Sequence, residues 1–229
     1  MKDRVVLITG AKGGLGTYVT KTFLSQDATV VGASRSIAKE DFRSDQFTPL
    51  SVDFTQAAAV RAGIDATVQR FGRLDVVAHV LGGFAGGQAV ADTDDATWQQ
   101  MQDLNLTGAF YVLRAAIPPL RKSPHGRIVV IGSLAAAEQH AGLGAYVAFK
   151  TALAALVRTV ALENKDVGLT ANVILPGTMD TPANRKAMPG SDFSKWLDPQ
   201  EVANLAVWLA SDEAGHITGA AIPIDNPHA

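Results

Sequence analysis

The sequence predicts an α/β fold of Rossmann type, in which helices cover both faces of a doubly wound, mostly parallel sheet of seven strands. Short apolar runs alternate with longer helical stretches along the chain, and this order of elements builds a parallel sheet through right-handed crossovers. A glycine-rich turn, Gly10–Gly16, stands between the first run and the first helical stretch, where dinucleotide-binding folds carry it. No repeat, low-complexity tract or linker divides the chain, so we expect one domain over residues 1–229.

Seven runs supply the expected strands. They are rich in Val and Ile and apolar nearly throughout, as strands buried on both faces are. The predicted strands are Arg4–Thr9, Ala28–Ala33, Thr48–Val52, Leu74–Leu81, Arg127–Gly132, Leu169–Leu175 and Ala221–Ile224.

The stretches between these runs predict helices at Gly14–Ser25, Gln56–Phe71, Ala96–Ile117, Ala145–Asn164 and Pro199–Ala210. The pair Pro118-Pro119 is expected to end the third helix, because proline lacks the N–H that a helix interior needs. Ser34–Phe47 is too short for a full crossover and predicts a turn or a stub of helix. Pro176–Asp198, rich in Pro, Gly, Asp and Ser, predicts a long irregular segment of the kind that often forms a lid.

Composition and charge exclude several classes of protein. Hydrophobic residues make up 47% and charged residues 18% of the chain, which is typical of a folded domain. The formal net charge of -2 does not favour a nucleic acid or an anionic membrane as partner. The apolar start Val5–Ile8 is too short for a signal peptide or a membrane span, so we expect a cytoplasmic protein. Cysteine is absent, which excludes thiolate metal sites, and no metal-ligand spacing relates His125, His140, His216 and His228.

The turn after the first strand is expected to bind a dinucleotide. Its glycines let the backbone turn tightly and approach a pyrophosphate, and the helix that follows offers free N–H groups and a positive dipole. Because glycines also serve ordinary turns, the strand before and the helix after are what favour this interpretation. The ATP-type string G-x-x-x-x-G-K-[ST] is not present. The residues expected at the phosphates are Gly10, Gly13, Gly14, Leu15 and Gly16.

The end of the second predicted strand bears on which dinucleotide binds. An acidic residue there would hold the ribose 2′-hydroxyl of NAD, whereas a basic residue would hold the 2′-phosphate of NADP. The strand ends in Ser34-Arg35, with no acid until Glu40. Arg35 can pair with a phosphate, Ser34 can donate to it, and Lys12 adds positive charge nearby. We therefore favour NADP, with NAD as the alternative and a solvated loop arginine as the simplest competing interpretation.

Asp53 and Phe54 follow the third strand, where two interpretations stay open. The carboxylate of Asp53 can accept a hydrogen bond from the adenine amino group, with Phe54 beside the ring. Alternatively, Asp53 caps the next helix, a role that Thr55 can serve equally well.

A tyrosine and a lysine four residues apart give the candidate catalytic pair. Tyr146 and Lys150 share one face of the predicted helix Ala145–Asn164, and a cation beside a phenol lowers its pKa. By itself this spacing is usually a solvated helix face. Two neighbours favour catalysis. Ser133 follows a strand, at the sheet edge where ligands bind, and Asn105 interrupts an apolar helical stretch, where an amide needs a partner.

Together these residues resemble the short-chain dehydrogenase/reductase family over essentially the whole chain. The family's T-G-x-x-x-G-x-G turn matches Thr9–Gly16, its Pro-Gly pair after the sixth strand matches Pro176-Gly177, and a later threonine matches Thr181. Its catalytic Asn, Ser, Tyr and Lys match, in order and spacing, Asn105, Ser133, Tyr146 and Lys150. The resemblance implies an NAD(P)-dependent enzyme that moves a hydride between its cofactor and a ketone, aldehyde or secondary alcohol.

The same resemblance implies a role for each matched residue. Tyr146 would be the general acid in reduction and the base in oxidation, and Ser133 would hydrogen-bond the substrate oxygen. Lys150 would hold the ribose hydroxyls and lower the pKa of the tyrosine. Asn105 would anchor a water that links Lys150 to solvent. The residues implied to hold the nicotinamide carboxamide are Pro176, Gly177, Thr178 and Thr181.

One segment departs from the family pattern. Where the family usually has Asn-Asn-Ala-Gly after the fourth strand, this chain has His79-Val80-Leu81-Gly82. The glycine that lets the backbone approach the cofactor is kept, and we expect Leu81, Gly82 and Gly83 to border it. We interpret His79 as a structural histidine that replaces one hydrogen bond of the missing asparagines.

A narrower resemblance concerns the rim of the expected substrate pocket. The segments Leu81–Gly87 and Asp180–Pro189 are similar to dihydropteridine reductases. The animal pteridine enzymes lack the serine and asparagine found here and prefer NADH, so the rim and the catalytic set indicate different substrates. The rim residues either form a wall over a flat substrate or only pack the lid. The candidate substrate-lining residues are Phe84, Ser133, Tyr146, Met188 and Trp196.

The helix Ala145–Asn164 also bears on assembly. It is apolar on nearly every face, which indicates burial on the sheet on one side and on another subunit on the other. We predict a homo-oligomer, either a dimer or a tetramer. Three functions stay open: an oxidoreductase of carbonyl compounds and alcohols, a reductase of a quinonoid dihydropterin or a related C=N bond, and a non-catalytic NAD(P)-binding regulator.

Overall fold

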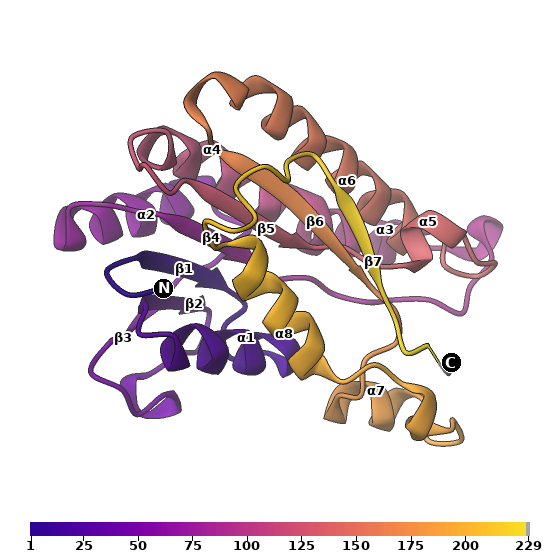
Figure 1. Ribbon diagram of the computed structural model, residues 1–229. Coiled ribbons are helices and arrows are strands. Elements are labelled where there is room, and N and C mark those ends of the chain that lie inside the picture. The colour runs from indigo at the N-terminus through magenta and orange to yellow at the C-terminus, as the bar shows by residue number, and fades with distance from the viewer. Residues whose placement is uncertain (228–229) are drawn as a thin grey trace.

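The computed structural model describes residues 1–227 (Figure 1), so His228 lies outside the described residues. The strands are β1 (Val5–Thr9), β2 (Thr29–Ser34), β3 (Phe47–Ser51), β4 (Val76–His79), β5 (Arg127–Ile131), β6 (Thr170–Pro176) and β7 (Ala221–Ile224). They form one sheet in the order β3-β2-β1-β4-β5-β6-β7, and each neighbouring pair is parallel. This confirms the predicted Rossmann-type sheet.

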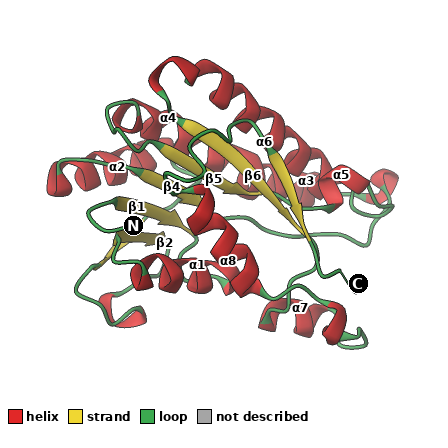
Figure 2. Cartoon of the chain, viewed as in Figure 1, coloured by secondary structure: helices red, strands yellow, loops and turns green. Residues whose placement is uncertain are grey.

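Helices separate the strands (Figure 2). They are α1 (Gly14–Ser25), α2 (Ala57–Phe71), α3 (Asp95–Gln102), α4 (Gly108–Leu120), α5 (Ala135–Glu138), α6 (Gly144–Glu163), α7 (Pro182–Ala187) and α8 (Pro199–Leu209). Short helical turns lie between them: η1 (Lys39–Asp41), η2 (Val90–Asp92), η3 (Asp103–Thr107), η4 (Lys165–Val167) and η5 (Phe193–Lys195). The turn η1 provides the short helix expected within residues 34–47.

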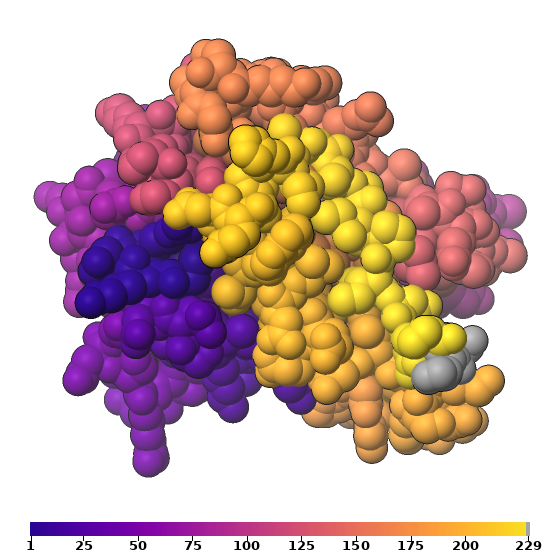
Figure 3. Space-filling model, viewed as in Figure 1, coloured from indigo at the N-terminus to yellow at the C-terminus, as the bar shows by residue number. Residues whose placement is uncertain are grey.

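Two apolar layers hold the helices on the sheet. Successive residues of a strand point to opposite faces, so Leu7 packs in the layer under α2, α4 and α6, whereas Ile8 packs in the layer under α1 and α8. Figure 1 shows these helices on the two sides of the sheet. In the space-filling view, the yellow surface of the C-terminal segment lies directly beside the indigo surface of the first residues (Figure 3). The layer under α1 and α8 extends from β3 to β7, whereas the layer under α2, α4 and α6 extends from β3 to β6.

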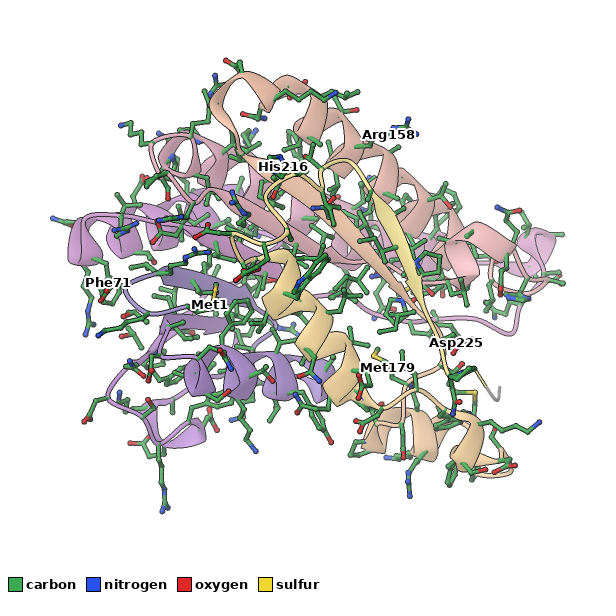
Figure 4. The ribbon with its side chains drawn as sticks, viewed as in Figure 1. Met1, Phe71, Arg158, Met179, His216 and Asp225 are labelled. Carbon is green, nitrogen blue, oxygen red and sulfur yellow. The ribbon has the colours of Figure 1, made fainter. Side chains whose placement is uncertain are left out.

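The order of the strands places a crevice at one edge of the sheet. The chain winds outward from β1 to β2 and β3, then returns to β4 on the other side of β1. In such sheets ligands bind beyond the carboxyl ends of the strands where the order reverses. Figure 4 shows Met179 and Asp225 near this edge, while Met1 and Phe71 lie on the opposite side of the molecule.

Three expected elements differ from the observed ones. The expected helix Ala96–Ile117 is divided into α3 and α4 by the π-helical turn η3. Pro118 and Pro119 do not end α4, which continues to Leu120; the amide of Arg121 still donates to the Ile117 carbonyl at 2.9 Å, because prolines near a helix end remove only the bonds of their own nitrogens. The expected irregular segment after β6 contains α7 and η5, each started by a side-chain cap.

The helix α6 is long and apolar enough to cross a membrane by length and composition alone. In the structure it packs on the sheet through Leu153, Val157 and Val160, and it carries the buried Lys150. These contacts are those of a core helix of a folded domain.

Candidate active site

A cavity of about 350 Å³ opens at the carboxyl edge of the sheet, beside β1 and β4. Twelve of the predicted cofactor residues line it: Gly10, Gly13, Gly14, Leu15, Gly16, Ser34, Arg35, Asp53, Phe54, Leu81, Gly82 and Thr181. The lining also includes residues that the sequence did not single out: Thr55, Val80, Leu104, Met179, Ala183 and Asn184. Most of them are direct neighbours in the chain of a residue that the sequence did predict. Including one further residue on each side of the predicted motifs would have found them.

The glycine-rich turn is shaped for close contact with a ligand. Gly10 has a φ of +69°, and a Cβ at Gly16 would collide with the carbonyl oxygen of Gly10, so a side chain is excluded at both positions. The N-cap of α1, Gly13, has no side-chain hydrogen bond. The first amides of α1 are therefore available to an anion at the positive end of the helix dipole. This cradle fits the pyrophosphate of a dinucleotide.

The outer end of the cavity carries charged side chains of both signs. Arg35 and Asp53 both line it, while the predicted neighbour Lys12 pairs with Asp41, with 2.9 Å between Nζ and Oδ1. The Oδ1 of Asp53 accepts hydrogen bonds from the amide and hydroxyl of Thr55 at 3.0 and 2.8 Å. These two bonds hold the pKa of Asp53 below its usual value. The suggestion that Asp53 or Thr55 caps α2 is wrong, because Gln56 is the N-cap residue.

Lys150 and Asn105 meet beside Gly82, one of the residues that line the cavity. The ammonium of Lys150 donates to the carbonyl of Ile131 at 3.0 Å, and the Asn105 Oδ1 accepts from the amide of Gly83 at 3.1 Å. A Cβ at Gly82 would lie 3.0 Å from the Lys150 Nζ and 3.1 Å from the Asn105 Oδ1, so both polar atoms lie beside this glycine. Burial lowers the pKa of Lys150 to about 8, because water no longer solvates the ammonium.

The π-helical turn η3 explains how an amide comes to lie here. Asn105 is fully buried and sits in the middle of this turn. Its Nδ2 donates to the Met101 carbonyl at 3.1 Å, which satisfies the side chain from both ends. Single π-helical turns inside α-helices are frequent at functional sites, and this one aims Asn105 at the glycines after β4.

Tyr146 lies in the first turn of α6, near the side chain of Ser133. Neither of these two residues lines the cavity. Burial raises the pKa of Tyr146, and the Ser133 side chain lowers it by less. Lys150 is not among the causes of this shift. The ammonium lies 5.9 Å from the centre of the tyrosine ring and points to the Ile131 carbonyl, so desolvation of the phenol prevails.

The three apolar candidates for the substrate wall, Phe84, Met188 and Trp196, have different surroundings. The ring of Phe84 meets that of Tyr146 edge-on, with 5.1 Å between centroids, and 65% of Phe84 is exposed. Trp196 instead packs on Phe193, with 4.7 Å between ring centroids, which matches the alternative that it packs the lid. Met188 follows α7 and is exposed.

The predicted nicotinamide-binding segment runs along the same edge. The Pro176 carbonyl accepts from the Leu134 amide at 2.9 Å, and the Gly177 amide donates to Ile224 at 2.9 Å. The Thr178 carbonyl accepts from the Leu197 amide at 2.9 Å. These bonds anchor the start of the segment to the ends of the neighbouring strands. Thr181 follows as the N-cap of α7 and touches the glycine-rich turn, since a Cβ at Gly14 would lie 3.4 Å from its side chain.

His79 occupies the position where the chain departs from the family pattern. It is fully buried, and its Nδ1 lies 2.9 Å from the Thr9 hydroxyl, which also accepts from the Leu81 amide at 3.3 Å. Its Nε2 has no partner among the described residues. Burial, with the nearby charge of Lys150, lowers the pKa of His79 to about 3. The imidazole is therefore neutral at physiological pH and ties β4 to β1, which agrees with its interpretation as a structural histidine.

Comparison with known proteins places this site in a family. A family model described as enoyl-(acyl carrier protein) reductase matches residues 10–226. A 2,5-dichloro-2,5-cyclohexadiene-1,4-diol dehydrogenase of Sphingobium indicum is 34% identical over 98% of this chain and 96% of its own length. A 3-alpha-(or 20-beta)-hydroxysteroid dehydrogenase of Mycobacterium tuberculosis is 32% identical over 97% of this chain and 88% of its own. The structure of ElxO with NADP bound superimposes with a TM-score of 0.91 at 28% identity, covering 100% of this chain and 99% of that one.

The fold, the cavity and these matches together define a nicotinamide-dependent oxidoreductase that acts on alcohol or ketone substrates. More specifically, the chain belongs to the short-chain dehydrogenase/reductase family. The match with the family model begins in the glycine-rich turn and ends just after β7, so it covers every strand but β1.

Proposed function

We propose that this chain is an NADP-preferring reductase, or dehydrogenase in the reverse direction, in which Tyr146 carries the proton. The observation that carries the proposal is that Tyr146 lies beside the buried Lys150, with 5.9 Å between the ammonium and the centre of the tyrosine ring. The Ser133 side chain acts on the same phenol and lowers its pKa. A non-catalytic binder has no use for two convergent hydroxyls with a buried lysine behind them.

The residues of the site divide the work between binding and proton transfer. The glycine-rich turn and the N-terminus of α1 hold the pyrophosphate, and Thr181 with residues 176–178 holds the nicotinamide end. The cofactor, when bound, supplies or accepts the hydride. Because burial raises the pKa of Tyr146, the phenol keeps its proton at neutral pH and can give it to the carbonyl oxygen during reduction. The Ser133 hydroxyl orients that oxygen through a hydrogen bond.

Lys150 and Asn105 support this proton transfer without contacting the substrate oxygen themselves. The ammonium of Lys150 is buried beside Gly82 and Asn105, where it stabilises negative charge that develops on the phenol. Asn105 is locked by its bonds to Gly83 and Met101. Its place in the π-helical turn supports the family's role for it, which is to anchor a water that returns protons to Lys150.

Preference for NADP is supported by the outer end of the cavity. Ser34 and Arg35 line it after β2, with no carboxylate at the position that would hold a 2′-hydroxyl. The similar ElxO structure has NADP bound. Phosphate recognition by a guanidinium and a hydroxyl is the usual solution for this cofactor.

A ring-containing substrate is supported by Phe84. An aromatic side chain that is 65% exposed and meets the Tyr146 ring edge-on offers an apolar face to a cyclic molecule at the catalytic hydroxyl. The two curated relatives described above are named for a cyclohexadiene diol and a hydroxysteroid, which are both cyclic alcohols. We propose a cyclic ketone or its alcohol as the substrate class.

A second candidate is the reduction of a quinonoid dihydropterin or a related C=N bond. The feature that favours it is the Leu81–Gly87 segment, which is similar to that of dihydropteridine reductases and carries Phe84 over Tyr146. A flat pterin would stack on such a side chain. The presence of Ser133 and Asn105 favours the carbonyl chemistry over this candidate.

The test is oxidation of NADPH and of NADH with a panel of cyclic ketones, diketones, steroids and dihydropterins, each compared between the wild type and Tyr146→Phe. We expect turnover with a cyclic ketone that falls on the order of a hundredfold or more in the variant, while NADPH binding by calorimetry changes little. Turnover of a dihydropterin alone would favour the second candidate. Cofactor binding without Tyr146-dependent turnover of any compound would identify a regulator and overturn the proposal.

A further inference from the structure

An ion pair joins the glycine-rich turn, whose glycines line the cofactor cavity, to η1. The Nζ of Lys12, in the glycine-rich turn, is 2.9 Å from the Oδ1 of Asp41 in η1. The Lys12 side chain is 47% exposed and that of Asp41 is 23% exposed. The pair thus joins the turn after β1, which lines the cavity, to the segment after β2, which begins at the lining residue Arg35.

The backbone brings this pair next to the expected 2′-phosphate position. The amides of Gly10 and Ala11 both donate to the carbonyl of Ala33, at 2.8 and 3.3 Å. The residue before Lys12 therefore lies against the end of β2, and Ser34 and Arg35 follow Ala33 directly. A flexible lysine side chain at this place can reach a phosphate between the two loops, provided that nothing else holds it.

Asp41 is fixed in position to hold Lys12. Its Oδ2 accepts a hydrogen bond from the Ala38 amide at 2.9 Å, and the same loop is anchored by the Lys39 ammonium, which donates to the Ser44 and Phe47 carbonyls. The Ala38 amide and Lys12 keep the pKa of Asp41 below its usual value. The carboxylate is therefore charged at physiological pH and is not free to move away.

The charges at this end of the cavity cancel. Arg35 and Asp53 line the cavity with one charge of each sign, and the Lys12–Asp41 pair beside them adds one more of each. A 2′-phosphate is attracted by the cations and repelled by both carboxylates. A neutral 2′-hydroxyl responds much less to the net charge of these side chains. Removing the Asp41 charge would leave a net positive rim and release Lys12 from its pair.

We propose that Asp41 is a cofactor-specificity residue that acts through Lys12: by holding the ammonium away from the 2′-phosphate, it weakens binding of NADPH and leaves room for NADH. This inference rests on the proposed function, because it assumes that the cavity binds a nicotinamide dinucleotide. Asp41 is the last residue of η1 and lies seven positions after Ser34, the end of β2, so it is not the acid that ends the second strand in NAD-binding folds.

The test compares the dissociation constants of NADPH and NADH by isothermal titration calorimetry with the full chain. Five proteins are compared: the wild type, Asp41→Asn, Lys12→Met, the double variant and a control. Asp45→Asn is the matched control, because Asp45 is an exposed residue of the same loop, forms no ion pair with Lys12 and loses the same charge. We expect Asp41→Asn to raise the preference for NADPH on the order of 3- to 10-fold, and Asp45→Asn to change it less than about 2-fold.

The double variant decides the mechanism. If Asp41 acts through Lys12, Asp41→Asn changes the preference little in the Lys12→Met background. An equal change in both backgrounds, an equal effect of Asp45→Asn, or no effect of Asp41→Asn would each overturn the inference. Binding of neither cofactor to the wild type would instead overturn the proposed function, so the two failures are distinguishable.

Discussion

At the scale of single residues, His79 makes the free energy of unfolding depend on pH. In the folded state its pKa is about 3, because burial and the charge of Lys150 disfavour the imidazolium. In the unfolded chain its pKa returns to about 6.5. Below that value the unfolded state takes up a proton that the folded state does not, so the contribution of neutral His79 to stability is present above pH 6.5 and is lost as pH falls.

We predict that His79→Asn makes the protein less sensitive to acid. Between pH 7 and pH 5 the wild type should lose about 2 kcal/mol of unfolding free energy more than the variant, as the two pKa values require. Urea unfolding at both pH values measures the difference, and the other titrating groups cancel in the comparison. Parallel losses in the two proteins would contradict the assignment.

At Gly82 the absence of a side chain leaves room for two polar groups of the site. A Cβ there would lie 3.0 Å from the Lys150 Nζ and 3.1 Å from the Asn105 Oδ1, closer than those atoms accept without moving. We predict that Gly82→Ala displaces the ammonium and lowers kcat/KM about tenfold or more, since small displacements of catalytic groups are costly. Gly190→Ala is the control, because no atom lies within 4 Å of its Cβ position. Equal steady-state rates for the two variants would count against this geometry.

At the scale of elements, Asp75 ties three segments together at the amino edge of the sheet. It is fully buried. One carboxylate oxygen accepts from the Val5 amide at 2.8 Å, the other from the Ser123 hydroxyl at 2.5 Å, and Arg73 donates to both. Burial alone would raise the pKa of Asp75, but these bonds outweigh it and the pKa is lowered.

We predict that Asp75→Ala destabilises the fold by about 2–4 kcal/mol, because it leaves the buried Val5 amide and Ser123 hydroxyl without a partner. Asp65→Ala is the control: its pair with Arg61 is exposed on both sides, and such pairs contribute less than about 1 kcal/mol. Urea unfolding at pH 7 measures both. A loss no larger than that of the control would show that the three segments are held by packing alone.

Helices and strands could be predicted where the signal lies within the residues of the element itself. Every predicted strand has a counterpart in the sheet, because an apolar run between turns is a local signal. The division of one long helix at η3 has no such signal. Its π-helical turn depends on Asn105 finding Gly83 across the site, a contact between residues far apart in the chain.

The same limit applies to the site. The matched motifs placed the glycine-rich turn and the end of β2 in the lining of one cavity. The pairing of Lys12 with Asp41, and the direction of the pKa shift of Tyr146, depend on which atoms burial and folding bring together. Spacing along a helix places Lys150 near Tyr146, but not the Ile131 carbonyl that binds its ammonium.

At the scale of the whole molecule, an unpartnered face runs along α6 and α4. On α6 the exposed residues Ala148, Thr151, Ala155, Thr159 and Leu162 follow helical spacing along one side. On α4 the exposed side carries Phe110, which is 41% exposed. Small residues with a few large apolar ones allow two helices to approach closely, and large exposed apolar patches mark interaction sites. We propose that a second copy of this chain covers this face, as the predicted homo-oligomer requires.

We predict that Ala155→Arg converts the oligomer into a monomer. Arginine is a good helix former and Ala155 is exposed within one chain, so the folded monomer tolerates it, but a long charged side chain in the middle of a helix pair does not fit. Ala58→Arg, on the exposed side of α2, makes the same change away from this face and should leave the assembly intact. Light scattering at micromolar concentration reads the mass of each protein. A monomeric wild type would show that no subunit contact forms. An unchanged oligomer in Ala155→Arg would show that the subunit contact lies on another face.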